Sequence, residues 1–239
     1  ELVEGYTREA GVRTLERLIA SVCRKVAKMI VSDPEFTSFT VKPENLESLL
    51  GPRKFTKDQL AGEDTIGLVN GLAWTSVGGE LLPIEVAVME GTGKIQLTGS
   101  LGDVMKESAG AAITCIRTRA GALGISPKFY EKCDIHIHAP EGAVPKDGPS
   151  AGIAMATAIT SALCGIPVRH DVAMTGEITL QGRVLPIGGL KEKSMAAYKN
   201  GIHTVIIPAE NVPDLAEVDA VVKEHIQFIP VKRVDTVLE

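Results

Sequence analysis

The sequence predicts an α+β chain in which a small all-helical part precedes a larger part of mixed helices and strands. Apolar residues recur every three or four positions between residues 12 and 30, which is typical of an amphipathic helix. From residue 65 onwards, short β-rich runs punctuated by glycine alternate with helical patterns. The residues between these parts are mostly polar and charged and show no period. We therefore expect a helical domain over residues 1–50, a linker over 51–64 and a mixed domain over 65–239.

The helical part is predicted to contain two helices. The first, over residues 12–30, has an apolar stripe on one face and arginine and lysine on the other. The stripe consists of Leu15, Leu18, Ile19, Val22, Val26 and Ile30. The second helix, over residues 43–50, begins with Pro43, which suits a first helical turn, and ends at Gly51.

Glycine-punctuated strands open the mixed part. We expect strands at residues 66–74, 82–89 and 94–98, with a hairpin turn at Gly78-Gly79 and a second turn at residues 91–93. Short turns between consecutive strands predict an antiparallel meander.

The rest of the mixed part should alternate helices and strands. Helices over residues 103–122 and 150–163 flank a strand over 134–139, and a loop over 140–149 leads into the second helix. The remaining expected elements are strands at 172–175, 184–187, 204–207 and 226–229 and helices at 189–200 and 215–223.

Composition argues against several classes of function. A net charge of -5 and a pI near 5.6 leave no basic surface that would make nucleic acid the primary partner. No apolar run approaches the roughly 20 residues that cross a bilayer, and we expect a cytoplasmic protein. Four scattered cysteines without a CxxC pair predict buried free thiols. Because the chain starts without methionine, in the approach to a helix, we expect it to be part of a longer polypeptide.

One serine, Ser150, lies in a rigid loop at the start of a predicted helix. A serine in this position is usually a helix cap, but Pro145, Gly148, Pro149 and Gly152 leave the backbone little freedom, which suits a positioned nucleophile. The motif fits G-x-S-x-G, the nucleophile elbow of α/β-hydrolases, which follows a buried strand. Here the preceding residues are rich in proline, glycine and charge, so that fold is not expected.

A serine nucleophile needs a base, and two kinds of base remain open. His136 and His138 share one face of a predicted strand, with Asp147 or Asp134 as the orienting carboxylate. The same histidines suit a metal, but no third ligand is marked nearby. A lysine serves only if apolar neighbours lower its pKa from about 10.4 to about 7 to 8, at a cost of about 4 kcal/mol.

Two lysines compete for that role, because residues 184–194 place a buried strand and a glycine pair before a lysine-containing helix. Lys193 shares a helix face with Leu190, Ser194 and Ala197, whereas Lys191 shares one with Met195 and Tyr198. The small residues beside Lys193 favour it slightly. For either lysine alone, a solvated surface charge is the ordinary explanation.

Long ungapped stretches of this sequence resemble the Lon protease family, specifically its A-type bacterial members. The matching stretches are residues 5–17, 141–152, 174–180 and 184–193. The resemblance covers essentially the whole chain. It implies a small helical AAA+ lid subdomain followed by an α+β Lon-type protease domain with a Ser-Lys dyad.

The resemblance also implies roles for individual residues. Ser150 matches the nucleophile and Lys193, not Lys191, matches the general base. Thr175 matches a residue that hydrogen-bonds the lysine amine. Residues that line the site in the family match Glu85, His136 and Asp147.

Arg13 matches the sensor arginine that contacts ATP in the family, where ATP and magnesium bind a larger ATPase subdomain. No Gly-x4-Gly-Lys-[Ser/Thr] stretch occurs in this sequence, since Gly91 and Gly93 before Lys94 fit only a hairpin turn. We therefore expect no cofactor and only ATP-independent peptide cleavage from this chain.

The resemblance further implies homohexameric rings that degrade unfolded or damaged and regulatory proteins, with possible DNA binding elsewhere in the full-length protein and no membrane partner. Two other functions stay open from the residues alone. One is a Ser-His hydrolase that uses His136 or His138, and the other is a noncatalytic module for ring assembly.

Overall fold

The computed structural model of the chain describes residues 1–33, 35, 37–55, 62–140, 142 and 144–239. The chain divides into two compact units, Glu1–Asp58 and Gln59–Glu239. Of the expected linker over 51–64, residues 56–61 lie outside the described part, so its extent stays a prediction.

The first unit is helical, as predicted. Its helices are α1 (Leu2–Tyr6), α2 (Arg13–Ser32), the 3-10 turn η1 (Pro43–Asn45) and α3 (Leu46–Leu50). Its small core contains Tyr6, Val22, Leu46 and Leu49, all buried. The Tyr6 hydroxyl donates to the Gly51 carbonyl at 3.0 Å and joins α1 to the end of α3. Only α1 was not expected from the sequence.

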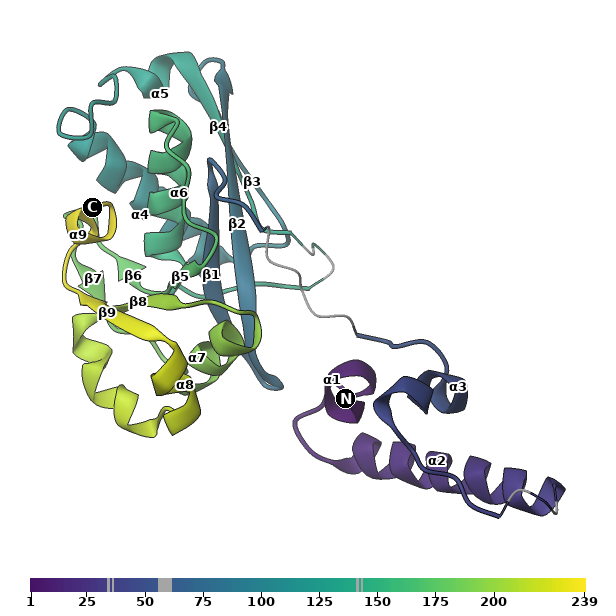
Figure 1. The fold of residues 1–239 in the computed structure, drawn as a ribbon. Coiled ribbons are helices and arrows are strands. Elements are labelled where there is room, and N and C mark those ends of the chain that lie inside the picture. Colours follow the sequence, from purple (N-terminus) through teal and green to yellow (C-terminus); the bar gives the residue numbers. More distant parts are fainter. Residues whose placement is uncertain (34, 36, 56–61, 141, 143) are drawn as a thin grey trace. The chain divides into compact units, whose positions relative to one another are not determined.

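The second unit is built on a mixed sheet, which has seven strands in the described residues (Figure 1). Across the sheet the order is β3-β4-β2-β1-β5-β8-β9. The strands are β1 (Leu68–Thr75), β2 (Gly78–Glu90), β3 (Ile95–Thr98), β4 (Cys133–His138), β5 (Val172–Met174), β8 (Thr204–Pro208) and β9 (Gln227–Val231). A separate hairpin pairs β6 (Glu177–Ile178) with β7 (Val184–Leu185).

The predicted meander is wrong at its third strand. β1 and β2 form the expected antiparallel hairpin, although its turn lies at Ser76–Val77 and both glycines belong to β2. β4 lies between β2 and β3, antiparallel to the first and parallel to the second. Burial explains this order, because β4 contributes the buried Ile135 and Ile137 while the short β3 has mostly exposed side chains.

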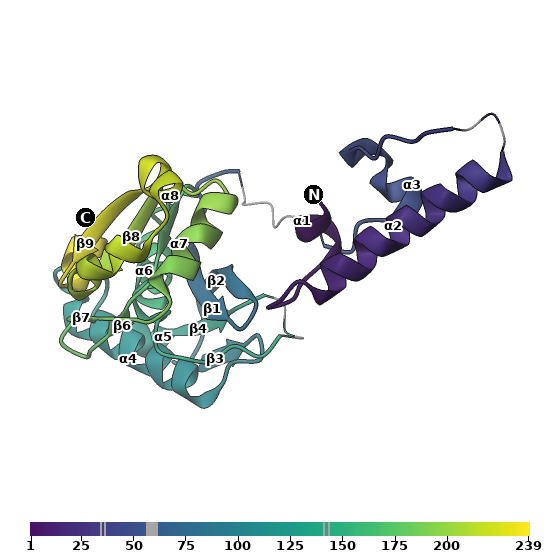
Figure 2. The ribbon, with the colours of Figure 1, turned by 90° about the horizontal axis from the view of Figure 1, so that it is seen from below.

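Helices cover both faces of the sheet (Figures 1 and 2). α4 (Asp103–Arg119) and α6 (Gly152–Cys164) pack on one face, and α7 (Leu190–Lys199) and α8 (Ala220–His225) on the other. Neighbouring residues of β5 alternate accordingly, with Met174 in the first apolar cluster and Ala173 in the second. The short helices α5 (Phe129–Lys132) and α9 (Val234–Val237) were not expected from the sequence.

The predicted helix over residues 215–223 is wrong in extent. The chain forms a 3-10 segment, η2 (Ala209–Glu217), and then α8. Pro213 lies inside η2 and lacks the N–H of a regular helix, and Val218 is extended between the two segments.

Two further predictions concern membranes and cysteines. In the described residues, no helix is long and apolar enough to cross a membrane. The cysteines are free, but only Cys115 is buried and Cys23 is exposed, which corrects the expectation that all four are buried.

Candidate active site

Ser150 lies directly before α6 and does not cap it. The N-cap position belongs to Ala151, and no side-chain capping bond closes this end of the helix. Gly148, two residues earlier, has φ +116°, a backbone conformation that favours glycine. The loop therefore holds Ser150 in place without using its hydroxyl as a cap.

The backbone around Ser150 is tied to the segment that follows β5. The Gly176 N–H donates to the Ser150 carbonyl at 2.8 Å, and the Ile153 N–H donates to the Gly176 carbonyl at 3.1 Å. On the other side, the Ser108 hydroxyl of α4 donates to the Pro149 carbonyl at 3.3 Å. Ser108 could not be recognised from the sequence, because a serine inside a helix carries no signal for such a contact.

Lys193 and Lys191, which the sequence could barely separate, differ sharply in burial. Lys193 is 2% exposed, whereas Lys191 is exposed. The Lys193 amine donates to the Thr175 hydroxyl at 3.0 Å, and Thr175 itself is fully buried. The Thr175 hydroxyl donates in turn to the Ser150 carbonyl at 3.3 Å. Thr175 thus connects the lysine amine to the backbone of the candidate nucleophile.

Burial has a direct electrostatic consequence for Lys193. Desolvation of the ammonium group lowers the pKa of Lys193 from 10.5 to about 8. Roughly a tenth of such a lysine is neutral at pH 7, whereas an exposed lysine is almost wholly charged. Lys193 therefore offers a free amine lone pair near neutral pH.

Asp147 anchors the serine loop to α4. Its carboxylate accepts the Met105 N–H at 3.0 Å, in the first turn of α4, and the Gly148 N–H at 2.9 Å. The Gly102 N–H donates to the Lys146 carbonyl at 2.7 Å beside it. Asp147 therefore acts on the loop and on the start of the helix, and it has no hydrogen bond to Lys193 among the described residues.

His136 and His138 lie on β4 and are both engaged with Thr98. The Thr98 hydroxyl is 2.8 Å from His136 Nε2 and 2.7 Å from His138 Nδ1. Glu85 is exposed on β2, in register with His138. No described contact links these three predicted site residues to Ser150. Asp134, one of the two candidate orienting carboxylates, accepts the backbone N–H groups of Thr92 and Lys94 at a turn.

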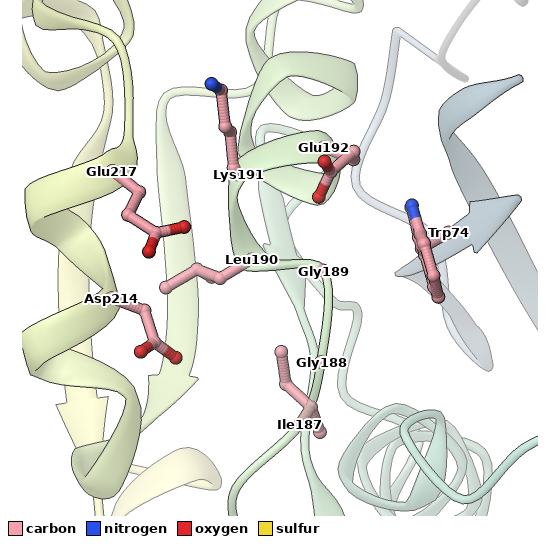
Figure 3. Close-up of a pocket in the computed structure, with 9 residues that line it drawn as sticks. All are labelled: Trp74, Ile187, Gly188, Gly189, Leu190, Lys191, Glu192, Asp214 and Glu217. Carbon is pink, nitrogen blue, oxygen red and sulfur yellow. The ribbon is translucent and has the colours of Figure 1, made fainter. Parts of the chain in front are cut away.

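A metal centre is not supported by the described side chains, since no group of three His, Cys, Asp or Glu residues there could hold an ion. A pocket of about 330 Å³ lies at the start of α7 (Figure 3). Its lining includes Trp74, Lys191 and the carboxylates of Glu192, Asp214 and Glu217, but neither Ser150 nor Lys193. The pocket therefore borders the helix that carries Lys193 without containing the candidate nucleophile or base.

Comparison with known families places this site in context. The profile of the Lon protease (S16) C-terminal proteolytic domain matches residues 40–239, and that of the Lon protease AAA+ ATPase lid domain matches residues 1–39. The chain belongs to the Lon protease family. Arg13, the predicted ATP sensor, is the exposed first residue of α2, within the lid match of this Lon chain.

Curated Lon proteases align with the whole chain. It is 58% identical to the Lon protease of Bacillus thuringiensis over 239 residues, which is 100% of this chain and 30% of the relative. It is 56% identical to the Lon protease of Haemophilus influenzae over 238 residues, again 100% and 30%. Identity to the Escherichia coli K12 Lon protease is 56% over 237 residues, or 99% and 30%. The chain thus spans about 30% of the length of these relatives.

Proposed function

We propose that this Lon family chain is a serine endopeptidase in which Ser150 is the nucleophile and Lys193 the general base. The observation that carries the proposal is the buried Lys193 amine, bonded to a threonine that also bonds Ser150. Burial without a carboxylate partner is what a lysine base requires, because a nearby negative charge would raise its pKa. Thr175 holds the amine on the side of the site where Ser150 lies.

The reaction we propose is acyl transfer through a covalent intermediate. Neutral Lys193 takes the proton from the Ser150 hydroxyl while the oxygen attacks the peptide carbonyl. The resulting ammonium then gives its proton to the leaving amine as the tetrahedral intermediate collapses. Water attacks the acyl ester in the second half of the cycle, and Lys193 again accepts and returns a proton.

We propose that backbone N–H groups at the start of α6 stabilise the oxyanion. The Gly152 and Ile153 N–H groups already donate to the Pro149 and Gly176 carbonyls. The N–H groups of Ser150 and Ala151 have no acceptor among the described residues. We assign the developing negative charge to these two donors.

The remaining predicted residues take supporting roles. Asp147 holds the serine loop on α4, as its hydrogen bonds suggest. Glu85 and His136 form the neighbouring wall of the substrate site. Arg13 senses ATP only in a full-length assembly that supplies the nucleotide-binding subdomain with ATP and magnesium.

In the full-length protein, we propose ATP-dependent degradation of unfolded or damaged proteins by a cytoplasmic homohexamer, with any DNA binding outside this chain. The present chain lacks the Gly-x4-Gly-Lys-[Ser/Thr] segment and should cleave small or unfolded peptides without ATP.

Acylation by a serine-reactive fluorophosphonate tests the dyad directly. Ser150→Ala should abolish labelling and turnover of a fluorogenic peptide. Lys193→Ala should slow both by at least about 10²-fold, because a general base contributes that much or more. The matched control is Lys191→Ala, which removes an exposed lysine from the same helix and should leave both rates unchanged.

Other outcomes would favour other functions. Full labelling of Lys193→Ala would exclude the lysine as base and favour a Ser-His hydrolase with His136 or His138. If the wild-type protein takes up no probe even in its oligomeric state, a noncatalytic module for ring assembly becomes the better explanation.

A further inference from the structure

The tip of the β1–β2 hairpin lies against the first turn of α7, the helix that carries Lys193. Trp74 of β1 and Gly79 of β2 lie at this contact, and they are directly opposite each other in the strand register. The hairpin tip is therefore a single paired unit that faces the helix start.

Gly79 fits against the helix backbone so closely that no side chain can be added without a shift of the backbone. A methyl group there would overlap the Glu192 carbonyl and lie 3.0 Å from the Lys193 backbone nitrogen. Because both atoms belong to the helix backbone and not to a flexible side chain, relief requires a shift of α7 against the hairpin tip.

Trp74 fixes the other end of the same turn. A Cβ on Gly189 would lie 2.8 Å from Trp74 Cγ, so the indole packs directly on the Gly189 backbone. Gly189 is the N-cap of α7 with φ +71°, and its carbonyl accepts the Lys193 N–H at 3.0 Å. Figure 3 shows the Trp74 ring on one side of the Gly188-Gly189 turn, opposite Asp214 and Glu217.

We propose that Gly79 and Trp74 are positioning residues for Lys193: they fix the first turn of α7 and thereby the point at which the lysine amine meets Thr175. The inference rests on the proposed role of Lys193 as base. Neither residue touches the reacting atoms, and both act through the backbone of residues 189–193. The amine lies at the end of a long side chain. Its possible positions are therefore limited by where the first turn of α7 holds the Lys193 backbone.

Gly79→Ala is the decisive variant, with two readouts. The added methyl should push α7 away from β2 and slow acylation of Ser150 by about 10²-fold, the cost of a displacement near 1 Å in a catalytic group. The second readout is the titration of Lys193, followed by NMR on isotope-labelled lysine and assigned with Lys193→Met. Its pKa should rise from about 8 toward that of an exposed lysine as the amine loses its buried position.

Gly188→Ala is the matched control. Gly188 lies beside Gly189, does not have a positive φ, and has nothing within 4 Å of an added Cβ. This variant should acylate and titrate as the wild type does. The proposal is overturned if a folded Gly79→Ala protein matches the wild type in both acylation rate and Lys193 titration.

Trp74 provides a second test that does not depend on the folding of Gly79→Ala. Trp74 is 60% exposed, so Trp74→Ala should fold, slow acylation by about ten-fold and shift the Lys193 titration upward. Trp74→Phe keeps a ring against Gly189 and should restore both the acylation rate and the Lys193 titration. An unchanged titration in Trp74→Ala would remove Trp74 from the proposal.

The two readouts separate this inference from the proposed function. If the wild-type protein fails to acylate but the Lys193 titration still moves in Gly79→Ala and not in Gly188→Ala, the positioning role stands and the peptidase assignment fails. If the wild-type protein acylates normally and the Lys193 titration moves in neither Gly79→Ala nor Gly188→Ala, the peptidase assignment stands and the positioning role fails.

Discussion

The Thr175 hydroxyl determines how the Lys193 amine can be used. A hydroxyl has one proton, and Thr175 gives it to the Ser150 carbonyl. The oxygen therefore meets Lys193 as an acceptor and takes one N–H of the amine. In the neutral lysine this leaves the nitrogen lone pair unused by Thr175. The arrangement binds the lysine without consuming the electron pair that a base needs.

Lys193 should make the fold less stable at neutral pH than an apolar residue would. Below pH 8 the folded protein carries a buried ammonium, and the drop in its pKa from 10.5 to about 8 corresponds to about 3 kcal/mol. We expect Lys193→Met to raise the free energy of unfolding at pH 7 by up to that amount while abolishing acylation.

The pH dependence of the free energy of unfolding tests whether the buried Lys193 ammonium destabilises the fold. Between about 8 and 10.5 the unfolded chain keeps a proton on Lys193 that the folded protein has released. The free energy of unfolding of the wild type should therefore rise with pH across this window relative to that of Lys193→Met. The difference in stability between the two proteins should close. Urea unfolding at several pH values measures it, with Lys191→Met as the exposed control. A gap that stays constant with pH would contradict the buried ammonium.

At the scale of elements, the serine loop and α4 hold each other in place. Asp147 accepts the Met105 N–H in the first turn of α4, where a regular helix leaves its N–H groups without partners. Leu101 and Lys146 form a parallel β-bridge just before the helix. A change at the start of α4 is therefore transmitted to the loop that presents Ser150.

Asp147→Ala should lose this connection. We expect a loss of about 1 kcal/mol in the free energy of unfolding, as for other helix caps. Acylation of Ser150 should slow as well, because the loop gains freedom. Asp147→Asn keeps an oxygen acceptor and should retain most of both properties. Thermal unfolding and probe labelling measure the two effects.

Asp103 offers a control at the same helix end. Its side chain is 96% exposed, and it pairs with Lys106 one turn along α4. Asp103→Ala should change stability by a few tenths of a kcal/mol and leave acylation intact. Equal losses in Asp103→Ala and Asp147→Ala would show that charge at the helix start, rather than the contact with the loop, is responsible.

At the scale of the whole molecule, the second unit has a complete core of its own. Every residue of its two apolar clusters lies between Val69 and Leu238. Asp64 and Thr65, just before β1, bond to His170 and Val168 of the same unit. We therefore expect the sheet and its covering helices to form without α1 to α3.

We expect a protein of residues 62–239 to fold alone, with a free energy of unfolding within about 0.5 kcal/mol of that of the main transition of the whole chain. It should also retain acylation of Ser150. A start after Thr65 serves as the comparison and should be less stable, since it removes the Asp64 and Thr65 contacts. Loss of folding in the 62–239 protein itself would contradict an independent core.

Local sequence was sufficient for most elements of both units. Apolar periodicity predicted α2 and α4, and alternation with glycine turns predicted β1, β2 and β4, because these signals depend on neighbours a few residues away. The four-residue helices α5 and α9 carry too short a pattern to be recognised. The place of β4 between β2 and β3 could not be predicted either, since strand order is decided by which side chains the whole sheet buries.

The candidate site divides in the same way. The sequence by itself determined a rigid loop around Ser150 and two lysines on a following helix, because proline, glycine and helical spacing act locally. Tertiary structure alone decided that Lys193 is buried and Lys191 exposed, and that Thr175 lies between Lys193 and Ser150. Burial and desolvation depend on which distant segments pack around a side chain, and the packing of α7 against the β1–β2 hairpin is a contact between segments more than 100 residues apart.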